Sequence, residues 1–276
     1  IGYSLTFGPT HGGFLGDSSF AFMNNISPYD CIDGQTIPSS LFVAFQMTFA
    51  LMVPVLITGV WAEKFNFLNA CLFMTIWPFL VYYPTAHWVW GGGWLTSEAS
   101  NDGLPGVLDY AGGIVIHTSS GVASLVVAIL LQNRRICNND YKNPTSNIPL
   151  SMVGVALIWV GWYSFNGGSG LRANGQAIGA LFVTQVSACF SSFTFSLLNL
   201  YYYKKIKLTQ IASGALAGLA GITPASGYVE SWVGIPYGII VGFASFFGAR
   251  YINSKLKLDD VLSYHQYLLD LGLFQT

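Results

Sequence analysis

Long apolar runs alternate with short polar stretches along most of this chain. A helix needs about 20 apolar residues to cross ~30 Å of hydrocarbon, and most of the runs reach that length. They lack the strict alternation of barrel strands, so the pattern indicates helices. It predicts full spans at residues 38–61, 65–85, 107–132, 149–168, 175–201, 207–224 and 233–252, and partial spans at 1–8 and 260–276.

Small residues interrupt several of these runs, as in "ASGALAGLAG" at 212–221. Small side chains let helix backbones approach closely in lipid, where packing replaces the hydrophobic effect as the force between helices. The fold class predicted from the pattern is therefore an all-α polytopic membrane protein.

Composition supports a lipid bilayer as the solvent. Hydrophobic residues make up 53% of the chain and charged residues only 8%, whereas a soluble domain carries about 25% charged residues. The net charge of −1 argues against a nucleic-acid partner. The four cysteines have no metal-ligand spacing, and no nucleophile–base pair or phosphate loop is evident. We therefore expect no metal, no cofactor and no enzymatic activity.

Basic residues divide unequally between the two sets of loops that the spans define. Ten of the eleven fall in one set, and Arg172 is the exception. Lys and Arg prefer the cytoplasmic side, so loops 10–37, 86–106, 169–174 and 225–232 are predicted to be external. The predicted cytoplasmic residues are Lys64, Arg134, Arg135, Lys142, Lys204, Lys205, Lys207, Arg250, Lys255 and Lys257.

Both ends of the chain carry apolar runs that are already in progress. "IGYSLTFGP" opens without a Met, and "DDVLSYHQYLLDLGLFQT" stops part-way through a run. We expect a single domain over residues 1–276 that is truncated at both ends.

Two polar residues, whose burial in hydrocarbon costs free energy, lie in the predicted span 107–132, in "DYAGGIVIHTSSG". Asp109 follows Pro105 and is expected in the first turn or two of the helix, where a carboxylate can accept free N–H groups. It could anchor the helix or contact a cation directly. His117 lies about 12 Å deeper, at ~1.5 Å per residue. It shares a helical face with small residues, which favours a pathway role over simple packing: Gly113, Ser120, Gly121 and Ser124.

Aromatic residues cluster at the ends of spans, where they are often interface anchors. Trp90 and Ser169 both fall at predicted external ends, beside glycines. An indole face and a hydroxyl would suit a small cation. Phe49 and Phe165 lie on separate spans that reach the same side, and composition leaves open whether they only pack or face lipid.

Five stretches together resemble the signatures of the ammonium transporter (Amt/Mep/Rh) family, and its ammonium transporter branch more than its Rh branch. They are "FQMTFALMVPVLITGVWAEKFNF", "AHWVWGGGWL", "VLDYAGGIVIHTSSGVASLV", "GWYSFNGGSGLRANG" and "GALAGLAGITPASGYV". They follow the family's order and cover nearly the whole chain from Ile1 to His265. The resemblance implies an eleven-helix fold built from an inverted repeat. This chain would start late in the second helix and stop within the tenth.

The resemblance implies an external mouth for ammonium. Trp90 is similar to the aromatic of the recruitment site, and Ser169 to its hydroxyl partner. Phe45 and Phe49 resemble the aromatic pair of the third helix. Phe49 and Phe165 would stack as a gate below the recruitment site.

The resemblance also implies a pore. Asp109 is similar to the acidic residue that supports the recruitment site, His117 to the first pore histidine and Trp162 to a pore-lining indole. His265, in "DVLSYHQ", occupies the position of the second pore histidine. Ser263 and Gln266 depart from the family's glycines there, which leaves open that His265 only ends a span.

These comparisons imply transport of ammonium or ammonia through a hydrophobic pore by a multi-pass protein of the plasma membrane. A homotrimer is implied, and a cytoplasmic regulator is a possible partner. An ammonium sensor or receptor with the same fold and an Rh-type gas channel are the alternatives. A signalling domain beyond Thr276 would distinguish the sensor.

Overall fold

The computed structural model describes residues 1–31, 35–61, 65–96, 106–131 and 147–256. Its helices in chain order are α1 (Gly2–Phe7), α2 (Ser39–Trp61), α3 (Phe67–Trp77), α4 (Tyr83–Trp90), α5 (Ser119–Leu130), α6 (Ile148–Gly168), α7 (Gly175–Tyr203), α8 (Leu208–Ile222) and α9 (Gly234–Leu256). Shorter elements are β1 (Thr10–His11), β2 (Leu15–Gly16), the 3-10 turns η1 (Ala21–Met23) and η5 (Ser231–Val233), and the π-helical turns η2 (Pro78–Tyr82) and η4 (Gly113–Thr118).

Six helical stretches in the described ranges are long and apolar enough to cross a membrane. They are Ser39–Trp61, Phe67–Trp90, Gly113–Leu130, Ile148–Gly168, Gly175–Tyr203 and Ser231–Tyr251. The predicted span 207–224 is helical as α8, but its 15 residues fall short of the usual crossing length. The predicted partial span 1–8 is the short helix α1, and the one at 260–276 lies outside the described residues. The chain is thus a mostly helical, multi-pass membrane protein.

The second predicted span, 65–85, ends too early. In the structure α3, η2 and α4 form one continuous helical stretch to Trp90. Pro78 opens the π-helical turn, and Pro84 lies at the start of α4. Proline lacks the backbone N–H that a regular α-helical turn uses as a hydrogen-bond donor. A π-helical turn shifts the pattern of backbone hydrogen bonds without breaking the helix. The polar and proline-containing end "YPTAHWVW" therefore continues a helix that hydropathy alone cuts short.

The span predicted at 107–132 begins later than its hydropathy indicates. Helical structure starts at Gly113, and Gly112 before it has φ +106°. Only glycine adopts that left-handed conformation without strain. Asp109 therefore precedes the helix, and the expectation that it lies within the first turns was wrong.

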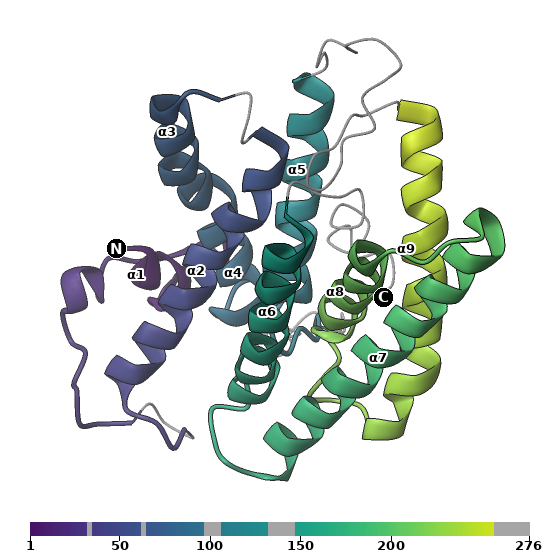
Figure 1. The fold of residues 1–276 in the computed structure, drawn as a ribbon. Helices are drawn as coiled ribbons and strands as arrows, with labels where there is room; N and C mark the ends of the chain where they lie inside the picture. Colours follow the sequence, from purple (N-terminus) through teal and green to yellow (C-terminus); the bar gives the residue numbers. More distant parts are fainter. Residues whose placement is uncertain (32–34, 62–64, 97–105, 132–146, 257–276) are drawn as a thin grey trace.

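Small residues bring α7, α8 and α9 into close contact. A Cβ added to Gly218 of α8 would lie 2.5 Å from the carbonyl oxygen of Ser187 on α7. One added to Gly238 of α9 would lie 2.5 Å from that same oxygen. Figure 1 shows α7 and α9 side by side at one edge of the molecule. The glycine-rich stretch at 212–221 thus packs as its composition predicts.

The other helices surround a central core. α2 packs against α5, α6 contacts α7 and α8, and α1 packs against α4 (Figure 1). The outer faces of α2 and α6 expose apolar side chains such as Leu51 and Leu157. Lipid is the solvent in which such faces are stable.

A small hairpin precedes the first span. β1 and β2 pair antiparallel, with Thr10 opposite Gly16, through a turn in which Gly12 and Gly13 have φ of +60° and +73°. After β2, the Ser19 hydroxyl and the Ser19 backbone N–H both donate to the Asp17 carboxylate. These bonds lower the pKa of the Asp17 carboxyl from its usual value, and the hydroxyl bond has the larger effect. This hairpin lies beside the end of α4.

Candidate functional site

Rings from four separate elements form a continuous column in the core. Phe49 of α2 lies 6.0 Å from Trp90 at the end of α4 and 4.7 Å from Phe165 of α6, measured between ring centroids. Phe165 in turn lies 6.0 Å from the His117 imidazole and 5.4 Å from Trp162. The structure therefore brings together five of the residues singled out in the sequence.

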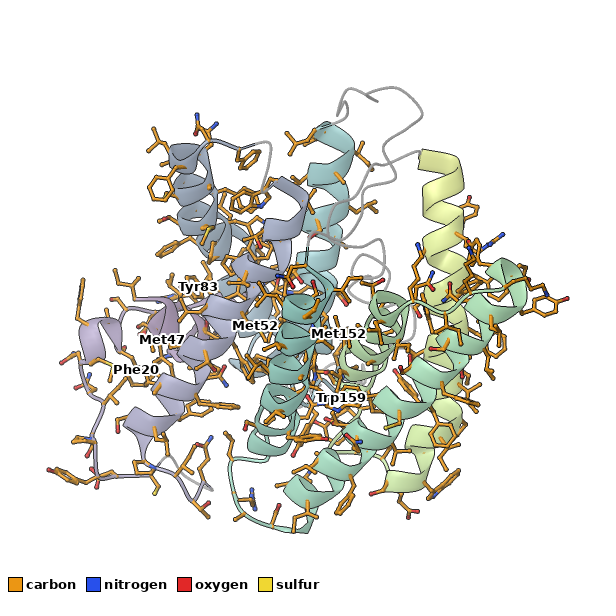
Figure 2. All side chains as sticks on the ribbon, in the orientation of Figure 1. Phe20, Met47, Met52, Tyr83, Met152 and Trp159 are labelled. Carbon is orange, nitrogen blue, oxygen red and sulfur yellow. The ribbon has the colours of Figure 1, made fainter. Side chains whose placement is uncertain are left out.

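Helix geometry explains this convergence. Phe45 and Phe49 are one turn apart on α2, and their rings meet edge to face with centroids 4.6 Å apart. The buried residues of α6 are Trp162, Phe165 and Asn166, which form one stripe along an otherwise exposed helix. Figure 2 shows side chains filling the space between α2, α5 and α6. Phe49 and Phe165 are therefore core residues and do not face lipid.

The Asp109 carboxylate caps the helix that contains His117. One oxygen accepts the N–H groups of Gly112 and Gly113 at 2.8 and 2.7 Å, and the other accepts those of Ile114 and Val115 at 2.7 and 3.1 Å. These are donors that a helix start leaves without intrahelical partners. Asp109 is only 4% exposed, so these four bonds replace water as the solvent of its charge.

Trp90 is joined directly to the Asp109 backbone. Its indole N–H donates to the Asp109 carbonyl oxygen at 2.8 Å, and Gly112 leaves room for the ring. The half-buried indole is therefore fixed in orientation by its polar edge, and its ring is tilted by 36° from that of Phe49. This links the end of α4 to the start of the helix that carries His117.

Ser169, which the family resemblance pairs with Trp90, bonds to its own helix in the structure. Its hydroxyl donates to the Phe165 carbonyl oxygen at 2.8 Å, one turn earlier on the same chain segment. The contacts among described residues do not join Ser169 to Trp90. Its hydroxyl oxygen retains acceptor capacity.

His117 lies at the inner end of the ring column. It is fully buried and stacks on Trp162 with ring centroids 5.3 Å apart and planes 12° apart. The Trp162 indole N–H donates to the Thr223 hydroxyl at 2.9 Å, and that hydroxyl donates to the Leu219 carbonyl. The small residues that share a helical face with His117 are also buried, as their spacing predicts: Gly113, Ser120, Gly121 and Ser124. His265 lies outside the described residues.

His87 is a buried residue whose contacts the sequence reasoning missed. Its side chain is fully buried, with Nδ1 2.7 Å from the Thr6 carbonyl oxygen and Nε2 3.0 Å from the Thr10 hydroxyl oxygen. A carbonyl only accepts, so Nδ1 must carry the proton. The one available signal was its position in "HWVW", three residues before Trp90.

Asn166 was also missed. Its amide nitrogen donates to the Thr184 hydroxyl at 2.8 Å, and that hydroxyl donates to the Ala180 carbonyl at 2.6 Å. The amide oxygen of Asn166 has no hydrogen-bond partner among the described residues. A buried polar residue thus directly follows Phe165 on α6.

The chemistry available at this site is that of rings and hydrogen bonds. No group of three or more His, Cys, Asp or Glu side chains within the described ranges could hold a metal ion. The column offers indole and phenyl faces, which attract cations, and one imidazole, which can donate or accept a proton.

Comparison with known proteins identifies the family. The family model described as Ammonium Transporter Family matches residues 1–267. The chain belongs to the ammonium transporter family. It is 42% identical to "Ammonium transporter 1" of Dictyostelium discoideum over 268 residues, and 41% identical to "Ammonium transporter" of Bacillus subtilis (strain 168) over 264 residues. Each match covers 95% of this chain, but the chain spans only 56% and 62% of those relatives.

Solved structures of the family share the fold. The crystal structure of Candida albicans Mep2 matches with a TM-score of 0.87 and 31% identity over 98% of this chain and 58% of that one. Saccharomyces cerevisiae Mep2 matches with a TM-score of 0.84 and 30% identity, over 98% of this chain and 60% of the Mep2 chain. A structure titled "Sensor Amt Protein" matches with a TM-score of 0.83 and 27% identity, over 99% of this chain and 66% of that chain. This family member therefore has the ammonium transporter fold.

Proposed function

We propose that the complete protein transports ammonium or ammonia across the membrane. The observation that carries the proposal is the ring column, in which Trp90, Phe49 and Phe165 lead to a buried His117 stacked on Trp162. Family membership makes ammonium the substrate to test first.

Ammonium is recruited at the predicted external end of the column. The cation is strongly hydrated, and its entry into an apolar pore requires other groups to replace water. The Trp90 face supplies cation–π attraction, and the Ser169 hydroxyl supplies an acceptor. Asp109 acts indirectly, because its four backbone hydrogen bonds hold the segment that orients Trp90.

The rings below the mouth exclude bulk water. Phe49 and Phe165 form the gate, with Phe45 above them, and both gate rings are buried. The cation loses a proton, and neutral ammonia crosses the apolar depth at a lower desolvation cost. His117 hydrogen-bonds ammonia or relays the proton, together with His265 and beside the Trp162 indole. Potassium has no proton to lose, which gives selectivity without a size filter.

Two alternatives use the same fold. A sensor would bind ammonium at Trp90 and Ser169 with little flux, and the similarity to the structure titled "Sensor Amt Protein" favours testing it. A gas channel of the Rh type would pass ammonia without recruiting the cation. We further propose a homotrimer in the plasma membrane with one pore per subunit, no enzymatic activity, and a cytoplasmic regulator as a possible partner.

The experiment measures flux and binding together. The full-length protein is reconstituted into vesicles, and uptake of labelled methylammonium is followed with and without competing ammonium and potassium. Transport predicts saturable uptake that ammonium inhibits and potassium does not. Saturable binding without uptake supports the sensor, and uptake that is insensitive to the ammonium cation supports the gas channel.

A further inference from the structure

The two groups proposed to recruit the cation come from different elements of the fold. Trp90 is the last residue of α4, whereas Ser169 directly follows α6. Their side chains are not joined by a hydrogen bond or ring contact among the described residues, so their relative position depends on what each of them packs against. The pair Asp109–Tyr110, which precedes η4, lies against both sides of this mouth.

The peptide unit between Asp109 and Tyr110 is held at both of its polar ends. Its carbonyl oxygen, from Asp109, accepts the Trp90 indole N–H at 2.8 Å. Its N–H, from Tyr110, donates to the Pro224 carbonyl oxygen at 3.0 Å, which anchors it to the segment after α8. Trp90 is therefore fixed directly to the residue pair whose second member carries the Tyr110 side chain.

The Tyr110 side chain reaches the Ser169 side of the mouth. A Cβ added to Gly170, the residue after Ser169, would lie 2.9 Å from the Tyr110 hydroxyl oxygen. That hydroxyl makes no hydrogen bond to a described residue, so its contact with Gly170 is packing between surfaces. The tip of the phenol therefore occupies space that any side chain larger than a hydrogen at position 170 would need.

The connection between α8 and α9 supports the Tyr110 ring. A Cβ added to Gly227 would overlap carbon atoms of that ring, and Tyr228 packs on it edge to face with ring centroids 5.5 Å apart. The Gln176 side-chain amide donates to the Gly227 carbonyl oxygen at 3.0 Å, which ties this connection to the start of α7. The ring is thus held between Gly227 and Gly170, and a change at either glycine displaces it.

Given the proposed recruitment of ammonium at the external mouth, on which this rests, we propose that Tyr110 is a positioning residue. Its side chain sets where Ser169 lies relative to Trp90. Both groups act on one small cation, and both the cation–π attraction and the hydrogen bond depend on distance. Displacement of Ser169 weakens recruitment and leaves the gate rings and His117 in place. The KM for the cation therefore rises, and the maximal rate changes little.

Complementary substitutions at the contact between Tyr110 and Gly170 test this role in the full-length protein. Gly170→Ala places a methyl group against the phenol hydroxyl, so it should displace Ser169 and raise the methylammonium KM about fivefold. Tyr110→Phe removes the oxygen that the methyl group meets, so the double variant Tyr110→Phe/Gly170→Ala should return KM toward the wild-type value. The added methyl group also lies 3.2 Å from the Ala177 Cβ, so the recovery should be incomplete. Tyr110→Phe alone should change KM less than about twofold, since it keeps the ring and removes no hydrogen bond to a described residue.

Two further glycines provide a second perturbation and a matched control. Gly227→Ala displaces the Tyr110 ring from the α8–α9 connection and should also raise KM. Gly175→Ala, at the start of α7, adds a methyl group with no atom within 4 Å and should leave KM unchanged.

Methylammonium uptake into vesicles gives KM and the maximal rate for each variant, and the Tm in detergent reports its stability. A wild-type KM in Gly170→Ala or Gly227→Ala, or a double variant no better than Gly170→Ala alone, overturns the positioning role. A fall in Tm or maximal rate with KM unchanged assigns Tyr110 to structure only. Absence of saturable uptake by the wild-type protein overturns the transport function instead. The same variants are then ranked by the Kd for methylammonium from calorimetry, and the same order of variants is expected.

Discussion

The His117 imidazole lies parallel to the Trp162 indole, with 5.3 Å between ring centroids, and the indole is itself held by Thr223 of the segment after α8. One histidine on η4 is therefore oriented through residues of two other segments. The position of the imidazole depends on this packing as much as on its own helix.

We predict that His117→Ala leaves a folded protein with altered flux. The residue caps no helix, and its removal leaves the Asp109 hydrogen bonds in place. Methylammonium uptake should fall about tenfold or more, which corresponds to about 1.4 kcal/mol on the barrier. Uptake is compared with folded yield from size-exclusion chromatography. Trp162→Phe is the control, because it keeps a ring beside His117 while removing the N–H bond to Thr223. Loss of folded protein in His117→Ala would assign the residue to structure.

Asp109→Ala should fail in folding. It removes the acceptor of four N–H groups, three of them in buried hydrogen bonds, and each unpaired buried donor costs about 1–3 kcal/mol. Asp109→Asn should be intermediate, because an amide has one oxygen and can serve only two of the four donors. Thermal unfolding in detergent and folded yield rank the three proteins. Normal stability together with lost uptake in Asp109→Ala would show instead that the carboxylate contacts the substrate.

Trp90→Leu should weaken ammonium recruitment by about 0.5–2 kcal/mol, since it removes the cation–π surface. Competition between methylammonium and potassium measures this as reduced discrimination. Trp90→Phe is the matched variant, because it keeps a ring face and loses the N–H bond to the Asp109 carbonyl. If Trp90→Leu and Trp90→Phe lose discrimination equally, the external mouth requires the hydrogen bond to the Asp109 carbonyl and not the ring face.

His87→Leu should destabilise the contacts of α4 with α1 and with the N-terminal hairpin. It leaves the buried Thr6 carbonyl without its donor, at about 1–3 kcal/mol. His87→Asn retains an N–H near Nδ1 and should recover part of the loss. The Tm in detergent should fall by about 2–4 °C per kcal/mol for a chain of this size. Equal Tm values for Leu and wild type would contradict this role.

Composition and hydropathy were enough to predict both the solvent and the class of fold. With 8% charged residues the chain can only be stable in lipid, and lipid requires closed backbone hydrogen bonding. That requirement makes long apolar runs into helices, so spans such as 38–61 and 149–168 could be predicted within a few residues. The five family motifs likewise carried the family assignment. These motifs identified the candidate aromatic residues but did not predict which of their rings are in contact.

The start of the helix of His117 and the contacts between the rings depend on how the folded chain packs. Hydropathy continues from 107 to 132, but the Tyr110 N–H bonds the Pro224 carbonyl, and Gly112 turns the chain before Asp109 caps the helix at Gly113. Phe49, Trp90, His117 and Phe165 are far apart in sequence, and no periodicity relates them. Their column forms because four elements pack around one core, and the contacts between elements depend on side-chain shape and partners that a one-dimensional pattern does not contain.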